Sequence, residues 1–387
     1  MIIENETYLW EMNDANLPSK NLSGFTSPTT LSSFLCIKPG STVDLDWLQQ
    51  ETQNAERRLM ASGYFYKASV TILTPRKFPD RRTILVQVTE GFLMRFGGGS
   101  AYALIGQDNI NGERKHWLGV LGLNFLGGEY LDEQVLNSAW KWGISGYYTQ
   151  TSKDHFLVNS SAKEATLITG YAFSPDLHLD CDWRLNRIES DQTAPRTDIL
   201  IKPRLFAQWL HGTSAAPGYI TEQLQWGWLI PKSDPHIQYG LSKTAFLYSF
   251  DPQLVLAGQV CIGYADSHLP SFYQFDLYNT QAMMIRSGYS QAELLVDRFI
   301  LANLEYRFPI WDTLIPPIIK VYVNGFLFVD AGIGSIYPNT LDQPIKDAFG
   351  AGMHIKFDNP VFVDFSFAYG VNHNQKSRII FLATAGF

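Results

Sequence analysis

The feature that most constrains this chain is a series of short segments, after Gly91, in which apolar and polar residues alternate. In the segment 177–185, for example, Asp180, Asp182 and Arg184 alternate with apolar or aromatic neighbours. The segments average roughly ten residues, which is the length that a tilted β-strand needs to cross a bilayer. Because one face is apolar and the other carries isolated polar groups, the pattern is typical of a transmembrane β-barrel.

The predicted antiparallel barrel extends over residues 92–387. At about 18 residues for each strand with its connection, this stretch holds about 16 strands, an even number as in bacterial barrels. The last segment ends on Phe387, as expected if the final strand closes the barrel. The charged fraction is 17%, against roughly 25% in an average soluble domain, which fits the same class. Alternation alone would also fit a soluble all-β protein, because the barrel signal of each segment is weak.

Residues 1–91 have a different pattern. Leu48, Ala55 and Leu59 recur at helical spacing, and they predict a helix that Asp44 caps and that ends at Gly63. A shorter helix is expected to begin near Thr26 or Ser27, and strands are expected at 8–12, 67–75 and 82–90. The order of elements predicts a small α+β domain with its helices on one face of a three-stranded sheet.

Several classes of function find no support in the sequence. The net charge of −7 gives no basic footprint, so nucleic acid is not an expected partner. We find no P-loop, Rossmann, HExxH or GxSxG motif, so the chain is not expected to be an enzyme or to bind a cofactor. The eight histidines and three cysteines show no ligand spacing, so no metal site is expected and the thiols are expected to be free. No run of about 18 apolar residues predicts a transmembrane helix.

The first residues, MIIENETYLWEMND, are acidic and do not form a signal peptide. Either the protein is not exported, or a signal peptide has been removed ahead of Met1. The predicted transmembrane barrel favours the second interpretation.

Several segments together resemble the BamA superfamily of outer-membrane assembly and translocation proteins. ASGYFYKASVTI (61–72) and VQVTEG (86–91) are similar to the end of a polypeptide-transport-associated (POTRA) domain. GGGSAYALIGQDNINGERKHWLGVLGLNFLGGEY (97–130), MIRSGYS (284–290), LANLEYRFPI (301–310) and GFLFVDAG (325–332) are similar to barrel strands and to the sixth extracellular loop of that family. The resemblance implies one POTRA domain at 1–91 in the periplasm, and a transmembrane barrel at 92–387 in the bacterial outer membrane.

The resemblance also implies a loop that folds back into the barrel lumen. Its Arg-Gly-aromatic tip corresponds to Arg286, Gly288 and Tyr289, with Ser287 as an insertion that departs from the family pattern. The implied partner on the inner wall is a Phe-x-Asp-x-Gly strand, which corresponds to Phe328, Asp330 and Gly332. The alternative is that Arg286 is solvated and that Asp330 is an ordinary acid facing the lumen.

The first barrel strand, expected at 93–104, contains Gly97, Gly98 and Gly99. Glycines weaken a strand because they offer no side chains for packing. They can mark a bend beside the POTRA domain, or a weak seam with the last strand, Arg378 to Phe387. In the BamA superfamily this seam opens sideways as a lateral gate, and its free edge can pair with an incoming strand.

These features predict a barrel that inserts or translocates polypeptides without a nucleotide. The expected partners are unfolded outer-membrane or secreted polypeptides, the lipid bilayer and possible periplasmic accessory proteins. Two alternatives remain open at this point. One is a secretion pore for a dedicated partner, or the transport part of a self-exporting protein. The other is a passive diffusion pore.

Overall fold

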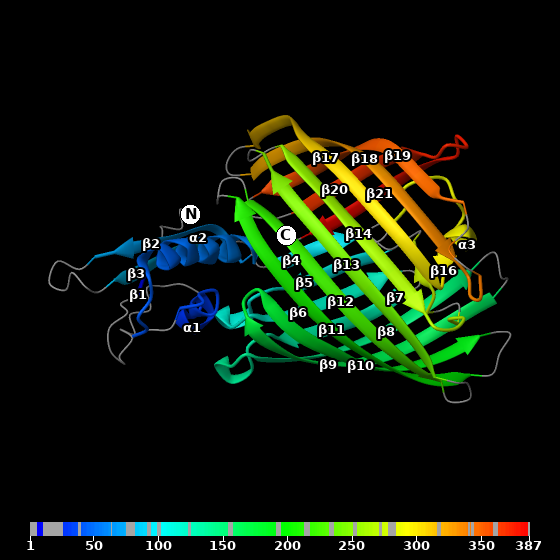
Figure 1. The fold of residues 1–387 in the computed structure, drawn as a ribbon, viewed down its shortest axis with the longest axis horizontal. Coiled ribbons are helices and arrows are strands. Elements are labelled where there is room, and N and C mark those ends of the chain that lie inside the picture. Colours follow the sequence, from blue (N-terminus) through cyan, green and yellow to red (C-terminus); the bar gives the residue numbers. More distant parts are fainter. Residues whose placement is uncertain are drawn as a thin grey trace.

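The computed structural model describes residues 6–10, 26–37, 40–62, 64–74, 82–90, 94–98, 102–122, 125–153, 158–190, 195–212, 217–231, 236–250, 254–270, 273–277, 284–315, 319–339, 341, 344–358 and 363–385. A small N-terminal unit, which we define as residues 6–90, lies at one end of a large barrel formed by residues 94–385 (Figure 1).

The N-terminal unit packs two helices against a three-stranded sheet with the order β1-β3-β2. Its elements are β1 (Glu6–Trp10), α1 (Pro28–Ser32), α2 (Leu45–Ala61), β2 (Phe65–Leu73) and β3 (Thr83–Glu90). Asp44 caps α2 as predicted, because its carboxylate accepts from two backbone N–H groups of the first turn. Leu48 and Leu59 of α2 and Ile84 of β3 are buried between the helices and the sheet. The helices and strands expected from the sequence are therefore present.

Sixteen antiparallel strands form a closed barrel. In the order of the chain they are β4 (Met94–Gly98), β5 (Tyr102–Gln107), β6 (Lys115–Gly122), β7 (Phe125–Asp132), β8 (Trp140–Lys153), β9 (Val158–Ser174), β10 (Leu177–Ser190), β11 (Arg196–Gly212), β12 (Pro217–Pro231), β13 (Ile237–Ser249), β14 (Val255–Ala265), β17 (Arg298–Ile315), β18 (Ile319–Ser335), β19 (Lys346–Asp358), β20 (Val363–Val371) and β21 (Ser377–Ala385). The antiparallel architecture and the strand number agree with the sequence analysis.

The alternation along each strand separates the two faces of the barrel wall. On β10, Asp180 and Asp182 face the lumen and are buried, whereas Trp183 and Leu185 face outward and are exposed. Exposed outward side chains throughout the barrel include Trp140, Trp209, Trp226, Trp228 and Trp311, as expected for a surface in contact with lipid.

One strand assignment made from the sequence needs correction, because the expected strand 93–104 is two strands, β4 and β5. The segment 130–142, which also alternates, is interrupted by a 3₁₀ turn, η2 (Val135–Asn137), and residues within 144–160 contribute to both β8 and β9. The alternating pattern alone did not mark these strand boundaries.

Candidate functional site

The connection between β14 and β17 folds into the barrel instead of projecting from it. It carries β15 (Phe275–Asp276), α3 (Gln291–Leu294) and β16 (Leu295–Val296), and β15 pairs with β16. Leu269, Leu277 and Ile285 of this connection are at most 1% exposed. They belong to the same apolar cluster as Phe299 and Phe326 of the barrel wall. The connection, which we call the inner loop, is therefore part of the core of the molecule.

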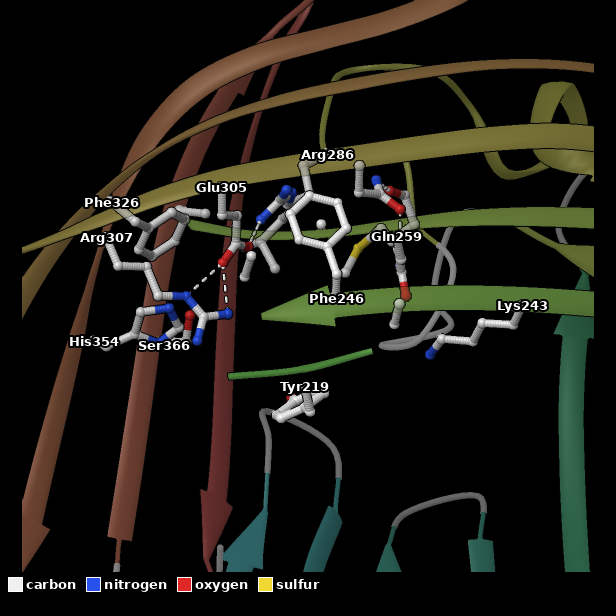
Figure 2. Close-up of a pocket in the computed structure, with 17 residues that line it drawn as sticks. Tyr219, Lys243, Phe246, Gln259, Arg286, Glu305, Arg307, Phe326, His354 and Ser366 are labelled. Carbon is white, nitrogen blue, oxygen red and sulfur yellow. Dashed lines mark hydrogen bonds and ion pairs between the residues drawn. The ribbon is translucent and has the colours of Figure 1, made fainter. Parts of the chain in front are cut away.

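Arg286 fixes the inner loop to the barrel wall. Its backbone N–H and its Nε both donate to Asp330 Oδ2, at 2.9 and 3.0 Å, and its Nη2 donates to Asp330 Oδ1 at 2.7 Å. Its Nη1 donates to Glu305. The guanidinium carbon lies 3.9 Å from the centre of the Phe328 ring. The structure thus brings together Arg286, Phe328 and Asp330, as the resemblance implied, and adds Glu305. Figure 2 shows Arg286 beside Glu305.

The carboxylates around Arg286 are themselves held in place. Asn303 donates through Nδ2 to Asp330 Oδ1 at 2.7 Å and to the Met284 carbonyl oxygen at 2.9 Å. Glu305 also accepts from Arg307, at 2.7 Å from Nη2. Asp330 is 0% exposed, so its charge depends on these donors for compensation. We call Arg286, Asn303, Glu305 and Asp330 the arginine clamp.

Ser287, the departure from the family pattern, does not displace Arg286 from Asp330. The Ser287 hydroxyl is buried and donates to the Asp347 carbonyl oxygen at 3.1 Å. Gly288 lies against the turn between β20 and β21, and a Cβ there would come within 2.8 Å of the Lys376 backbone. The Tyr289 hydroxyl donates to the Asp347 carboxylate at 3.2 Å. The tip is thus held by backbone and side-chain contacts on both sides of the insertion.

Gly332, the last residue of the implied wall motif, faces the inner loop. A Cβ at Gly332 would lie 3.0 Å from Ile285 Cδ1. Asn303, Asp347 and Gly370 are also neighbours of the tip, and no motif in the sequence pointed to them. Only the packed structure shows that Glu305 accepts from Arg286.

A cavity of about 380 Å³ lies in the lumen beside the arginine clamp. Its lining includes Arg286, Glu305 and Arg307, together with Ser366 and Ala368 of β20 and Ile380 of β21. Figure 2 shows Arg307 and Ser366 beside each other. The Lys243 ammonium also lines it, and no described carboxylate lies within ion-pair distance of this group. The clamp therefore borders open space next to the last strand of the barrel.

Within the described residues, the shortest pairing between neighbouring barrel strands is the seam between the first and last strands. Of the five residues of β4, only Gly98 pairs with β21, at Ala383. By contrast, β20 and β21 pair along their whole length, from Val363–Ala385 to Val371–Ser377. Gly97 and Gly98 also pair with β5, and Arg378 pairs with Gly370 of β20 and not with β4. Gly99 and Phe387 lie outside the described residues.

The N-terminal unit is fastened to the turns at one end of the barrel. Arg58 of α2 donates through Nε and Nη2 to Asp176, in the turn between β9 and β10, at 2.9 and 2.6 Å. The same guanidinium donates to Glu51 at 2.7 Å. Burial alone would lower the pKa of Arg58, but the hydrogen bonds to Asp176 and Glu51 outweigh burial and raise this pKa.

A second set of contacts supports this docking. The Tyr64 hydroxyl lies 3.0 Å from His116 Nε2, and the Thr30 hydroxyl donates to the Gly112 carbonyl oxygen at 2.7 Å. Burial by itself would raise the pKa of the Glu133 carboxyl. The nearby Arg114 guanidinium and His116 outweigh burial and hold this pKa well below its usual range. No local pattern in the sequence predicts these contacts, because their partners are far apart along the chain.

No protein-family model matches the sequence, and no curated protein sequence matches it. Solved structures do match. The chain superimposes on CdiB from Escherichia coli with a TM-score of 0.58 and 12% identity, covering 94% of this chain and 74% of CdiB. The chain therefore has the fold of this solved barrel.

Two further BamA-superfamily structures show the same fold. BamA from Haemophilus ducreyi lacking POTRA domains 1–3 gives a TM-score of 0.51 and 14% identity, covering 93% of this chain and 82% of that one. CdiB from Acinetobacter baumannii gives 0.55 and 13%, covering 94% and 72%. These similarities extend over the N-terminal unit and the barrel together.

Two observations concern what the described part of the chain does not contain. None of its helices is long and apolar enough to cross a membrane. Within the same residues, no group of three or more histidine, cysteine, aspartate or glutamate side chains is arranged to hold a metal ion.

Proposed function

We propose that the chain is an outer-membrane β-barrel that inserts or translocates polypeptides without a nucleotide. In this proposal residues 1–91 are a periplasmic POTRA domain and residues 92–387 are the barrel. The observation that carries it is the seam between β4 and β21, where Gly98–Ala383 is the single residue pair among the described residues of the two strands. An incoming strand can pair with the N–H and C=O groups of a strand edge that such a seam leaves free.

The wall beside the seam is also short. Strands β4 to β7 have between five and eight residues, whereas β11 has 17. At about 3.3 Å per residue and a tilt of about 40°, eight residues rise about 20 Å, less than the apolar band of about 25 Å that such barrels present. A bilayer that matches this side must become thinner, which lowers the cost of moving a polar polypeptide past it.

Two other functions follow from the same architecture. A secretion pore for a dedicated partner is supported by the similarity to two CdiB structures. A passive diffusion pore is less well supported, because the inner loop fills much of one side of the lumen with buried side chains such as Leu277 and Ile285.

The proposal can be tested by locking the seam with a disulfide between Gly98→Cys and Ala383→Cys, in a background where Cys36, Cys181 and Cys261 are serines. Oxidation should block the insertion of client barrels into liposomes, and reduction should restore it. The control pair, Tyr369→Cys with Ile379→Cys, joins β20 to β21, which are already fully paired, and should leave insertion unchanged.

Conductance through the lumen separates the alternatives. If the locked barrel inserts clients at the unlocked rate, sideways opening is wrong. Export of a secreted partner through a locked barrel would favour the secretion pore. Loss of insertion with unchanged conductance is the result that we expect.

A further inference from the structure

A row of hydrogen-bond donors crosses four neighbouring strands on the outward face of the barrel. Cross-strand pairing places Tyr148 of β8 beside Lys163 of β9, Lys163 beside Arg187 of β10, and Arg187 beside Thr197 of β11. Tyr148, Lys163 and Arg187 are exposed, and the Arg187 side chain is 60% exposed. We call these four residues the donor row.

The strand alternation fixes the direction in which the donor row points. Two residues further along, the same face carries Ala165, Leu185 and Ile199, and the next row carries Ile144, Leu167 and Trp183. Ile144, Leu167, Trp183, Leu185 and Ile199 are all exposed apolar side chains. The donor row therefore lies at the edge of the apolar band that faces lipid.

The distance along the strands places this edge on the far side of the barrel from the N-terminal unit. The turn at Asp176, to which Arg58 binds, lies eleven residues from Arg187 along β10. At about 3.3 Å per residue and a tilt of about 40°, this is about 28 Å along the barrel axis, close to the thickness of the hydrocarbon core. If the N-terminal unit is periplasmic, as the proposed function requires, the donor row lies at the level of the outer-leaflet headgroups.

Among the described residues, one of the two cations in the row, Arg187, has an acidic partner and the other, Lys163, has none. Lys163 and Arg187 are directly opposite each other on adjacent strands, an arrangement that destabilises a sheet unless an anion lies between them. Glu189 accepts from Arg187 Nε at 3.0 Å. In the part of the chain that the structure describes, no carboxylate lies within ion-pair distance of Lys163.

We propose that the donor row binds the phosphate groups of an outer-leaflet glycolipid. A phosphate between Lys163 and Arg187 would compensate both cations, and phosphate accepts charge-assisted hydrogen bonds from such donors. The hydroxyls of Tyr148 and Thr197 extend the row to about 14 Å across four strands, which suits a headgroup with more than one phosphate. The apolar rows next to it face the acyl chains of the same lipid.

Lone lysines and arginines are common at membrane interfaces, where they reach toward the headgroups without a specific ligand. The direct pairing of two cations distinguishes this site from that situation. If Lys163 had a purely structural role, Lys163→Gln would lower the unfolding temperature of the lipid-free protein. The lipid site predicts that this temperature does not fall, because removing Lys163 relieves its repulsion from Arg187.

The test uses the full chain, purified in detergent and freed of lipid, with diphosphorylated lipid A as the probe. The wild-type protein should bind it and unfold at a higher temperature in its presence. Lys163→Gln and Arg187→Gln should each raise the dissociation constant about tenfold, as expected for the loss of one charge-assisted contact. Lipid A without phosphates should bind at least about tenfold more weakly than the diphosphorylated form.

The control variant is Arg57→Gln with Lys67→Gln, which removes two cations from the N-terminal unit and should leave lipid binding unchanged. Faster migration of unheated samples on gels verifies that every variant is folded. Equal affinity for lipid A with and without phosphates would overturn the proposal, and so would an unchanged double variant at Lys163 and Arg187. If inorganic phosphate displaced bound lipid A as effectively as unlabelled lipid A does, the donor row would be a site for free phosphate instead. The assay contains no client polypeptide, so failure of the transport function would not affect its outcome.

Discussion

At the scale of single residues, the arginine clamp is the contact with the greatest consequence for stability. Arg286→Ala would leave Asp330 buried and without its main cation. Breaking a buried ion pair from one side costs about 3–5 kcal/mol. We expect the unfolding midpoint in urea to fall accordingly, whereas Gln53→Ala, at an exposed position of α2, should change it little.

The clamp also predicts coupling between its members. Asp330→Ala should destabilise as Arg286→Ala does, and the double variant should lose less than the sum of the two, because the residues are in contact. Full additivity would show that the two side chains do not interact in the folded protein.

A second prediction at this scale concerns the backbone of the loop tip. A Cβ at Gly370 would overlap the carbonyl oxygen of Arg286. Gly370→Ala should therefore push the tip off the wall and expose Arg286 to trypsin. Gly146→Ala is the matched control, since its Cβ would lie 3.7 Å from the nearest protein atom. Equal trypsin resistance of both variants would argue against a closely packed tip.

At the scale of elements, the inner loop is attached to two walls of the barrel. The arginine clamp holds it to β17 and β18, and Tyr273 holds it to β10 and β11. The Tyr273 hydroxyl donates to Asp198 at 3.1 Å and accepts from Asn186 at 2.9 Å. The loop therefore crosses the lumen as a strap.

Tyr273→Phe should free one end of this strap and leave the other attached. Loss of the hydroxyl removes one hydrogen bond from each of two buried partners, Asn186 and Asp198. Asp198 keeps its ion pair with Arg196, whereas a buried group left unsatisfied costs about 1–3 kcal/mol. We expect faster amide hydrogen exchange in 273–277 with little change in 284–290, and a higher single-channel conductance. An equal rise in exchange in both segments would show that the loop moves as one body.

At the scale of the whole molecule, docking of the N-terminal unit depends on Arg58 and on the acidic and basic groups around Glu133. Arg58→Ala should loosen the unit, whereas Arg57→Ala, one residue earlier on α2, should not. Spin labels at Gln53→Cys and Phe173→Cys would report the difference as a broader distance distribution. Identical distributions for both variants would mean that Asp176 does not hold the unit.

The same measurement has a defined pH dependence. The folded pKa of Glu133 lies below its unfolded value of about 4.3. The stabilisation that the ionised Glu133 carboxylate provides is therefore present above that pH and is lost as the pH falls through the folded pKa. Docking should be unchanged between pH 7 and pH 5 and should weaken only below about pH 4.3. Glu133→Gln should weaken docking at pH 7 and reduce this acid dependence.

The sequence by itself determined the class of the fold and its parts. The two-residue alternation after Gly91 is a local property, and it predicted outward apolar and inward polar faces without knowledge of which strands are neighbours. Asp44 and the helical spacing of Leu48 and Leu59 likewise predicted α2. The grouping of Arg286 with Asp330 came from resemblance to a family, and the structure contains that contact.

Only the tertiary structure decided which distant residues meet. The ion pair between Arg58 and Asp176 joins residues 118 positions apart, and Glu305 reaches Arg286 because β17 and the inner loop pack on one another. The split of 93–104 into β4 and β5, and the single pair at the seam, depend on how sixteen strands close into a ring. Closure relates the first strand to the last, so no local pattern specifies it.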